Sequence, residues 1–72
     1  MKKIKKIKIR LNGKVTKIDE SSKMQNLVNK FKIPLKKVAI ELNNEIINKK
    51  RLDKIKLKNK DKIEIVHFIG GG

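Results

Sequence analysis

The sequence predicts a small α+β domain in which one helix packs across a mixed β-sheet. The chain has 72 residues, which is enough for one hydrophobic core but leaves no room for a second. Apolar residues alternate with charged ones near both ends of the chain, as they do in half-buried strands, and between these stretches they recur at helical spacing. A helix placed between an early hairpin and later strands covers one face of a sheet.

A β-hairpin is the first element expected. In residues 7–11, Ile and Leu alternate with Lys and Arg, which is the pattern of a strand with one buried face. Asn12-Gly13 then gives the strongest short signal for a hairpin turn, because both residue types tolerate positive φ. Residues 14–18 predict the returning strand. Its register stays open, since Val15 and Ile18 can share a face only through a bulge.

One amphipathic helix is expected after the hairpin. Residues 19–22, Asp-Glu-Ser-Ser, offer N-caps for it. Four apolar residues then recur at helical spacing and form a stripe that we expect to pack in the core: Met24, Leu27, Val28 and Phe31. Pro34 disfavours a helical conformation at the residue before it, so the helix should end near residue 32 or 33.

Two further strands and a polar stretch follow. Residues 38–42 predict a third strand. Asn43-Asn44 predicts a turn after it, and residues 45–47 predict a short strand that follows the turn. Residues 49–54 are polar around Leu52, and they predict a loop or a single helical turn.

The last strand is expected over residues 62–69, after a turn at residues 59–61. It should lie beside the first strand and parallel to it, because the intervening helix supplies the crossover. This arrangement is the ubiquitin-like β-grasp, with a mixed sheet of four to five strands and one main helix. We expect residues 1–69 to form a single domain and residues 70–72 to form a flexible glycine tail.

The composition excludes several classes of protein. Without Cys, the chain can hold no disulfide framework, no thiolate metal site and no cysteine nucleophile. No long apolar stretch is present, so neither a membrane span nor a secretory signal is expected, and we expect a cytoplasmic protein. His67 is the only His, which argues against a metal site or a general base built on it.

The net charge of +14 suggests nucleic-acid binding as an alternative function. Lys, Ile and Asn are the dominant residue types, however, and all three have A/T-rich codons. Only 2 Phe are present, with no Trp or Tyr, so aromatic platforms for bases are nearly absent. Arg, which forms the bidentate contacts of base recognition, is also scarce. We therefore expect weak, salt-sensitive binding to polyanions and no specific nucleic-acid partner.

The closing run Gly70-Gly71-Gly72 carries the strongest chemical signal. These glycines follow an apolar strand directly, at a place where no turn is needed. Without Cβ atoms, an extended glycine tail can enter a slit that other residues would block. Its terminal carboxylate, ionised at neutral pH, is a poor electrophile. Conversion to an acyl-adenylate by ATP would expose the same carbon to a sulfur or nitrogen nucleophile.

Several stretches resemble the ThiS-type sulfur carrier proteins of thiamine biosynthesis. They are Leu11-Asn12-Gly13-Lys14, residues 38–43 before Glu45-Ile46-Ile47, and above all the run Glu64-Ile65-Val66-His67-Phe68-Ile69-Gly70-Gly71-Gly72. The terminal diglycine alone is shared with ubiquitin-like modifiers and with the small subunit of molybdopterin synthase. A related carrier for molybdopterin or another acceptor, and a modifier attached to lysines, therefore stay open as alternatives. The basic N-terminus and the high Lys content depart from the family pattern.

The resemblance implies a carrier that acts as a co-substrate and not as an enzyme. An E1-like adenylyltransferase, using ATP and Mg²⁺ in its own pocket, would adenylate the carboxyl of Gly72. A sulfur donor, such as a cysteine desulfurase relay, would convert it to a thiocarboxylate, and thiazole synthase would take the sulfur. The carrier would hold no cofactor of its own and would be a monomer when free.

Roles for single residues follow from the same resemblance. Gly72 would carry the adenylate and the thiocarboxylate, and Gly70 and Gly71 would form the slender tail. On the last strand, Val66 and Phe68 are out of phase with Ile63 and Ile65, so they should be exposed as a partner-binding patch. His67 and Ile69 would lie near that interface, and Leu42 and Ile47 are further candidates. The alternative for Phe68 is that it folds back on the edge of the domain.

Overall fold

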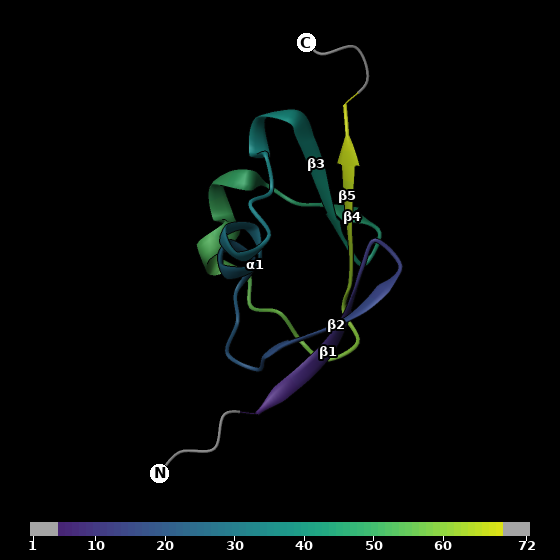
Figure 1. The fold of residues 1–72 in the computed structure, drawn as a ribbon. Coiled ribbons are helices and arrows are strands. Elements are labelled where there is room, and N and C mark those ends of the chain that lie inside the picture. The colour runs from purple at the N-terminus through teal and green to yellow at the C-terminus, as the bar shows by residue number, and fades with distance from the viewer. Residues whose placement is uncertain (1–4, 69–72) are drawn as a thin grey trace.

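Within residues 5–68, a five-stranded mixed sheet has one α-helix packed across it, and the arrangement can be followed in Figure 1. The computed structural model describes residues 5–68. The strands are β1 (Lys6–Leu11), β2 (Lys14–Asp19), β3 (Val38–Leu42), β4 (Glu45–Ile46) and β5 (Lys62–His67). The helix is α1 (Met24–Lys30), and two 3₁₀ segments are η1 (Leu35–Lys37) and η2 (Lys49–Lys54). The predicted architecture is therefore confirmed.

The sheet has the order β2-β1-β5-β3-β4, with the first and last strands side by side at its centre. β1 and β5 run parallel, and Arg10 faces Lys62 across them. On its other edge β5 pairs antiparallel with β3, from Leu42 opposite Ile63 to Val38 opposite His67. The helical crossover between β2 and β3 therefore makes the parallel central pair that the element order predicts.

The first hairpin resolves the register that the sequence left open. Every residue of β1 faces one of β2, from Lys6 opposite Asp19 to Leu11 opposite Lys14. Asn12 and Gly13 fill the two-residue turn with φ of 49° and 82°, values that suit a hairpin turn of the type I′ class. Ile18 lies in the core while Val15 is 61% exposed, so these two residues occupy opposite faces.

The helix is shorter than the apolar stripe predicted. Met24, Leu27 and Val28 are buried, as expected. Phe31 is 43% exposed, so its predicted place in the core is wrong. The reason is local: α1 ends at Lys30, Phe31 is its C-cap, and Lys32 turns to a φ of 51°. The chain therefore leaves the helix before the fourth stripe residue can reach the sheet.

The core lies between the sheet and the helical layer. η2 packs beside α1 on the same side of the sheet, and Leu52 is its buried residue (Figure 1). Residues from every layer make up the buried cluster: Ile9, Ile18, Met24, Leu27, Val28, Val38, Ile40, Leu52, Leu57 and Ile63. Among residues 5–68, no helix has the length and apolar character needed to cross a bilayer.

Candidate functional site

The face of the sheet that points away from the helix carries an exposed apolar surface. Val38 and Ile40 are fully buried, so Ala39 between them points outward, and Val66 faces Ala39 across the β3–β5 ladder. Phe68 follows two residues after Val66, just past the end of β5, and it is exposed as well. Ile46 of β4 faces Glu41, which lies on that outer face as well. We call Ala39, Ile46, Val66 and Phe68 the outer patch.

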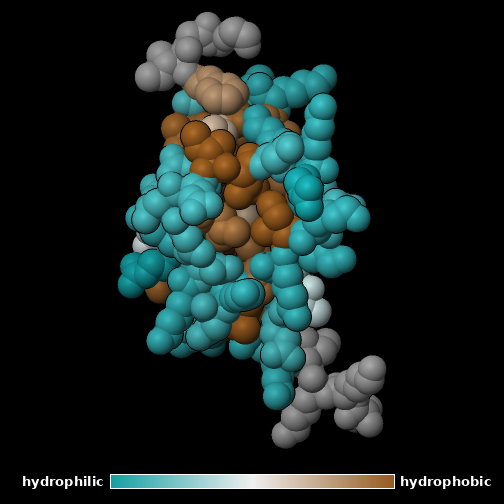
Figure 2. Space-filling model, turned by 180° about the vertical axis from the view of Figure 1, so that it is seen from behind, coloured by the Kyte–Doolittle hydropathy of each residue, from teal (hydrophilic) through white to brown (hydrophobic). Residues whose placement is uncertain are grey.

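The exposure of the outer patch is large for apolar side chains. Val66 is 45% exposed, Phe68 56% and Ile46 74%. Figure 2 shows hydrophobic residues gathered next to the C-terminal end of the described chain and framed by hydrophilic ones. Exposed apolar surface with a polar rim is typical of a protein–protein interaction site. The predicted exposure of Val66 and Phe68 is thus confirmed, and the Phe68 ring, though exposed, also contacts Lys49 at the edge of the domain.

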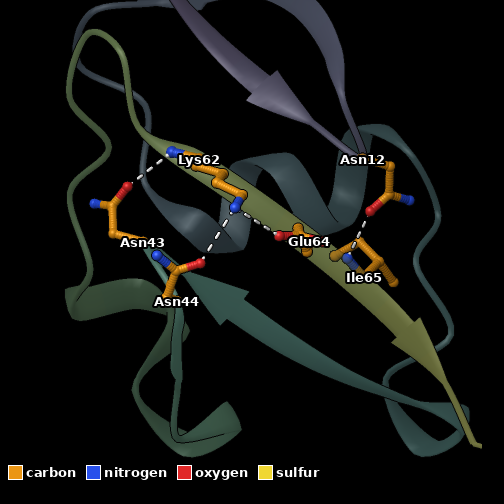
Figure 3. Close-up of polar contacts among 6 residues, drawn as sticks. All are labelled: Asn12, Asn43, Asn44, Lys62, Glu64 and Ile65. Carbon is orange, nitrogen blue, oxygen red and sulfur yellow. Dashed lines mark hydrogen bonds and ion pairs between the residues drawn. The ribbon is translucent and has the colours of Figure 1, made fainter.

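Polar side chains set the position of β5 at the rim of this surface (Figure 3). Lys62 donates its backbone N–H to Asn43 Oδ1 at 2.9 Å, and its ammonium group lies 3.2 Å from both Asn44 Oδ1 and Glu64 Oε1. The carboxylate of Glu64, which shares the outer face, is therefore paired within its own strand. These contacts fix the start of β5 against the β3–β4 turn.

Asn12 fixes the second half of β5. The paired residues of β1 and β5 end at Leu11 and Ile63, and Asn12 N–H donates to Ile63 O at 2.9 Å. The side chain of Asn12 continues this ladder, because its Oδ1 accepts a hydrogen bond from Ile65 N–H at 2.7 Å (Figure 3). Beyond Ile65, the hydrogen bonds described hold the strand from the β3 side alone. Just past the end of β5, Phe68 N–H donates to Lys37 O at 2.9 Å.

The structure places the predicted site residues as follows. Val66, His67 and Phe68 are exposed at or just past the end of β5. Ile69, predicted near the interface, and the predicted tail with its carboxyl, Gly70, Gly71 and Gly72, lie outside the described residues. Leu42 and Ile47, suggested as further patch members, instead pack against the core. Within residues 5–68, no group of three or more His, Cys, Asp or Glu could hold a metal ion.

Sequence reasoning missed Ala39 and Ile46 as members of the outer patch. A signal for Ala39 was present, since it alternates with the larger residues Val38 and Ile40 and so belongs to the opposite face. Ile46 gave a weaker signal, because β4 has only two residues and no alternation to read. Its face is defined by its pairing with Glu41.

Known proteins resemble this chain over most of its length. The family model that describes the ThiS family matches residues 9–72. A sulfur carrier protein ThiS of Bacillus subtilis is 42% identical over 65 residues, covering 89% of this chain and 98% of that protein. The crystal structure of a thiamine biosynthesis protein (ThiS) from Geobacter metallireducens superposes with a TM-score of 0.79 at 30% identity, covering 92% of this chain and all of that one.

A larger protein contains a similar segment. A thiazole synthase of Magnetococcus marinus is 33% identical over 66 residues, which are 92% of this chain but 20% of that protein. The solved structure agrees with the fold described above, and the family model and the Bacillus subtilis protein agree on the family. This chain belongs to the ThiS family.

Proposed function

We propose that this member of the ThiS family is the sulfur carrier for thiazole formation in thiamine biosynthesis, with its sulfur held on the carboxyl of Gly72. The observation that carries the proposal is the 42% identity, over nearly the whole chain, to a protein named as a sulfur carrier. The outer patch supports it, because Val66 on β5 and Phe68 just past its end directly precede Gly70-Gly71-Gly72 in the chain.

The proposed chemistry takes place at one carbon atom. An E1-like adenylyltransferase joins the Gly72 carboxylate to the α-phosphorus of ATP, and pyrophosphate leaves. The terminal sulfur of a persulfide, supplied by a cysteine desulfurase relay, attacks the acyl carbon and displaces AMP. A thiol then cleaves the acyl disulfide, is itself converted to a disulfide, and leaves the thiocarboxylate. In this scheme ATP and Mg²⁺ bind to the adenylyltransferase, and the carrier is a co-substrate.

The proposed acceptor of the sulfur is thiazole synthase. In Magnetococcus marinus, a segment similar to this chain makes up a fifth of a protein named thiazole synthase. The presence of a carrier-like segment in the same polypeptide as the synthase favours the view that the carrier and thiazole synthase act together. The outer patch offers a docking surface that includes Phe68, and Phe68 lies close to Gly72 in the sequence, so an enzyme docked there would bind near the end of the chain that carries the carboxyl.

Intact-mass analysis tests the carrier function. Incubated with ATP, Mg²⁺, the adenylyltransferase and a sulfur donor, the protein should gain the mass difference between sulfur and oxygen at its C-terminus. Deleting Gly72, or adding one residue after it, should abolish this gain, because the activated carboxyl is lost or misplaced. Circular dichroism of both variants should match the parent. Retention of charging by the shortened chain would contradict the proposal.

A pair of matched substitutions tests the outer patch. Val66→Asp places a charge within the patch, and we expect it to raise the KM of charging more than about tenfold, as loss of an interface anchor does. Val15→Asp is the control, since Val15 is also exposed on the outer face but lies on β2, two strands from β5. Equal effects of the two substitutions would exclude a specific docking role for the patch.

The acceptor is tested with the charged carrier itself. Incubated with thiazole synthase and the remaining thiazole precursors, the thiocarboxylate should be consumed and the thiazole formed. Transfer to molybdopterin synthesis instead would identify the related carrier class. Stable attachment of Gly72 to lysines of other proteins would identify a modifier.

A further inference from the structure

Phe68, the last residue that the structure describes, is attached to the body of the domain by a cluster of contacts. Its N–H donates to Lys37 O at 2.9 Å, one residue beyond the end of β5. The ammonium group of Lys49 lies 5.2 Å from the centroid of its ring. The same ammonium donates a hydrogen bond to Leu35 O at 2.5 Å, so Lys49 connects η2 both to η1 and to the end of β5.

We propose that Lys49 is a positioning residue, which holds Phe68 and so sets the direction in which the tail leaves the domain. This inference rests on the proposed function, because a fixed position of Phe68 matters only if the protein delivers its terminal carboxyl to an enzyme. We call the contacts of Lys49 with Phe68 and Leu35 the Phe68 clamp.

The placement of Lys49 distinguishes it from other lysines of the chain. Asn48 caps η2, because its Oδ1 accepts from Lys50 N–H at 2.9 Å and its backbone O accepts from Arg51 N–H at the same distance. This cap fixes the turn that carries Lys49. Lys49 is half-buried and its ammonium group donates to a backbone carbonyl, whereas the neighbouring Lys50 is exposed. A cation over an aromatic face is favourable, and more so when it is partly removed from water.

The length of the tail makes its starting direction important. A fully extended chain from Phe68 to Gly72 reaches about 13–14 Å. A swing of about 20° at its root would displace the terminal carboxyl of an extended tail by about 5 Å, so fewer arrangements of the tail would enter the slit of a partner. Holding Phe68 in place before the partner binds therefore reduces the entropy lost on docking. The effect should appear in KM and not in kcat.

The main test compares two substitutions that remove the same charge. Lys49→Met keeps an unbranched side chain but loses the ammonium, and we expect it to raise the KM of the charging reaction about three- to fivefold, with kcat within about twofold. Lys50→Met is the matched control and should leave KM near the parent value. Lys49→Arg, which can stack on the ring and donate to Leu35 O, should restore most of the loss. Equal effects of Lys49→Met and Lys50→Met, or no rescue by Arg, would overturn the proposal.

A second measurement needs no partner protein. In NMR spectra, the ring of Phe68 should shift the ε-methylene protons of Lys49 upfield, and Lys49→Met should speed exchange of the Phe68 amide. If Lys49→Met lowers stability, the same substitution is tested in a protein that already carries Phe68→Leu. Because the aromatic ring is then absent, the double variant should have the same KM as Phe68→Leu alone. An undiminished effect there would contradict the clamp.

These readouts separate the two proposals. If the parent protein is never charged with sulfur, the proposed function fails, while the ring-current shift and the amide exchange still report on the Phe68 clamp. If the parent is charged normally and the Lys49 variants behave like the Lys50 control, the clamp fails and the carrier function stands.

Discussion

Asn12 combines two roles in one residue. Its backbone takes a φ of 49° in the first turn, and its side chain accepts a hydrogen bond from Ile65 N–H. Asn43 also has a backbone role and a side-chain role. Its φ is 51°, and its side chain donates to Asp61 Oδ1 at 3.0 Å and accepts from Lys62 N–H. In both residues, the backbone conformation and the side-chain contact can be separated by substitution.

We expect Asn12→Gly to lower the free energy of unfolding by about 0.5–1.5 kcal/mol, since glycine keeps the positive φ but removes the acceptor of Ile65 N–H. Asn12→Ala should cost about 1–2 kcal/mol more, because alanine is strained in the left-handed region. Urea denaturation measures both changes, and amide exchange at Ile65 should accelerate in both variants. Unchanged exchange in Asn12→Gly would show that the side-chain bond does not hold β5.

Among the elements, η2 depends on a single side chain. Leu52 is 2% exposed and packs into the core, while the rest of the segment is polar. The segment is also irregular, since Arg51 departs from helical geometry with a φ of −118°. The packing of η2 against the domain, and with it the position of Lys49, therefore rests mainly on the burial of Leu52.

Leu52→Ala should lower the free energy of unfolding by about 2–5 kcal/mol, the usual cost of truncating a fully buried leucine. Lys50→Ala, in the same segment but exposed, serves as the control and should change stability little. Thermal and urea unfolding measure both variants. A loss below about 1 kcal/mol for Leu52→Ala would mean that the core closes without this residue.

The elements also differ in how far the sequence predicts them. Alternation predicted β1 and β5, and the crossover rule predicted their parallel pairing, because both follow from local pattern and chain connectivity. The exposure of Phe31 did not follow, since the end of the helix depends on the left-handed turn at Lys32. Ile46 was missed as a patch residue because only the pairing of β4 with Glu41 defines its face.

At the scale of the whole molecule, the net charge of +14 acts on stability. Among residues 5–68, the ion pairs found are Lys6–Asp19 and Lys62–Glu64, and both are well exposed. Exposed pairs contribute little, so most of the positive charge is uncompensated and the folded chain repels itself. This repulsion is an electrostatic cost that dissolved salt reduces.

Salt should therefore stabilise the protein. Raising the ionic strength from about 0.01 M to about 0.15 M shortens the Debye length from about 30 Å to about 8 Å. We expect the melting temperature to rise by about 4–8 °C, equivalent to about 1 kcal/mol. Lys50→Glu lowers the net charge at an exposed position. This substitution should raise the melting temperature at low salt and reduce the rise in melting temperature that added salt produces. A melting temperature that falls with added salt would contradict this account.

The central position of β5 has a mechanical consequence. This strand leads along the chain toward Gly70-Gly71-Gly72, and it is bonded to β1 over its first half and to β3 as far as His67. A force that draws the tail into an enzyme acts along the strand, so it loads the flanking hydrogen bonds together in shear and does not open them one after another. A strand at the edge of the sheet would bear the same pull with hydrogen bonds on one side only. The domain can thus be held by its end, and its fold resists the tension.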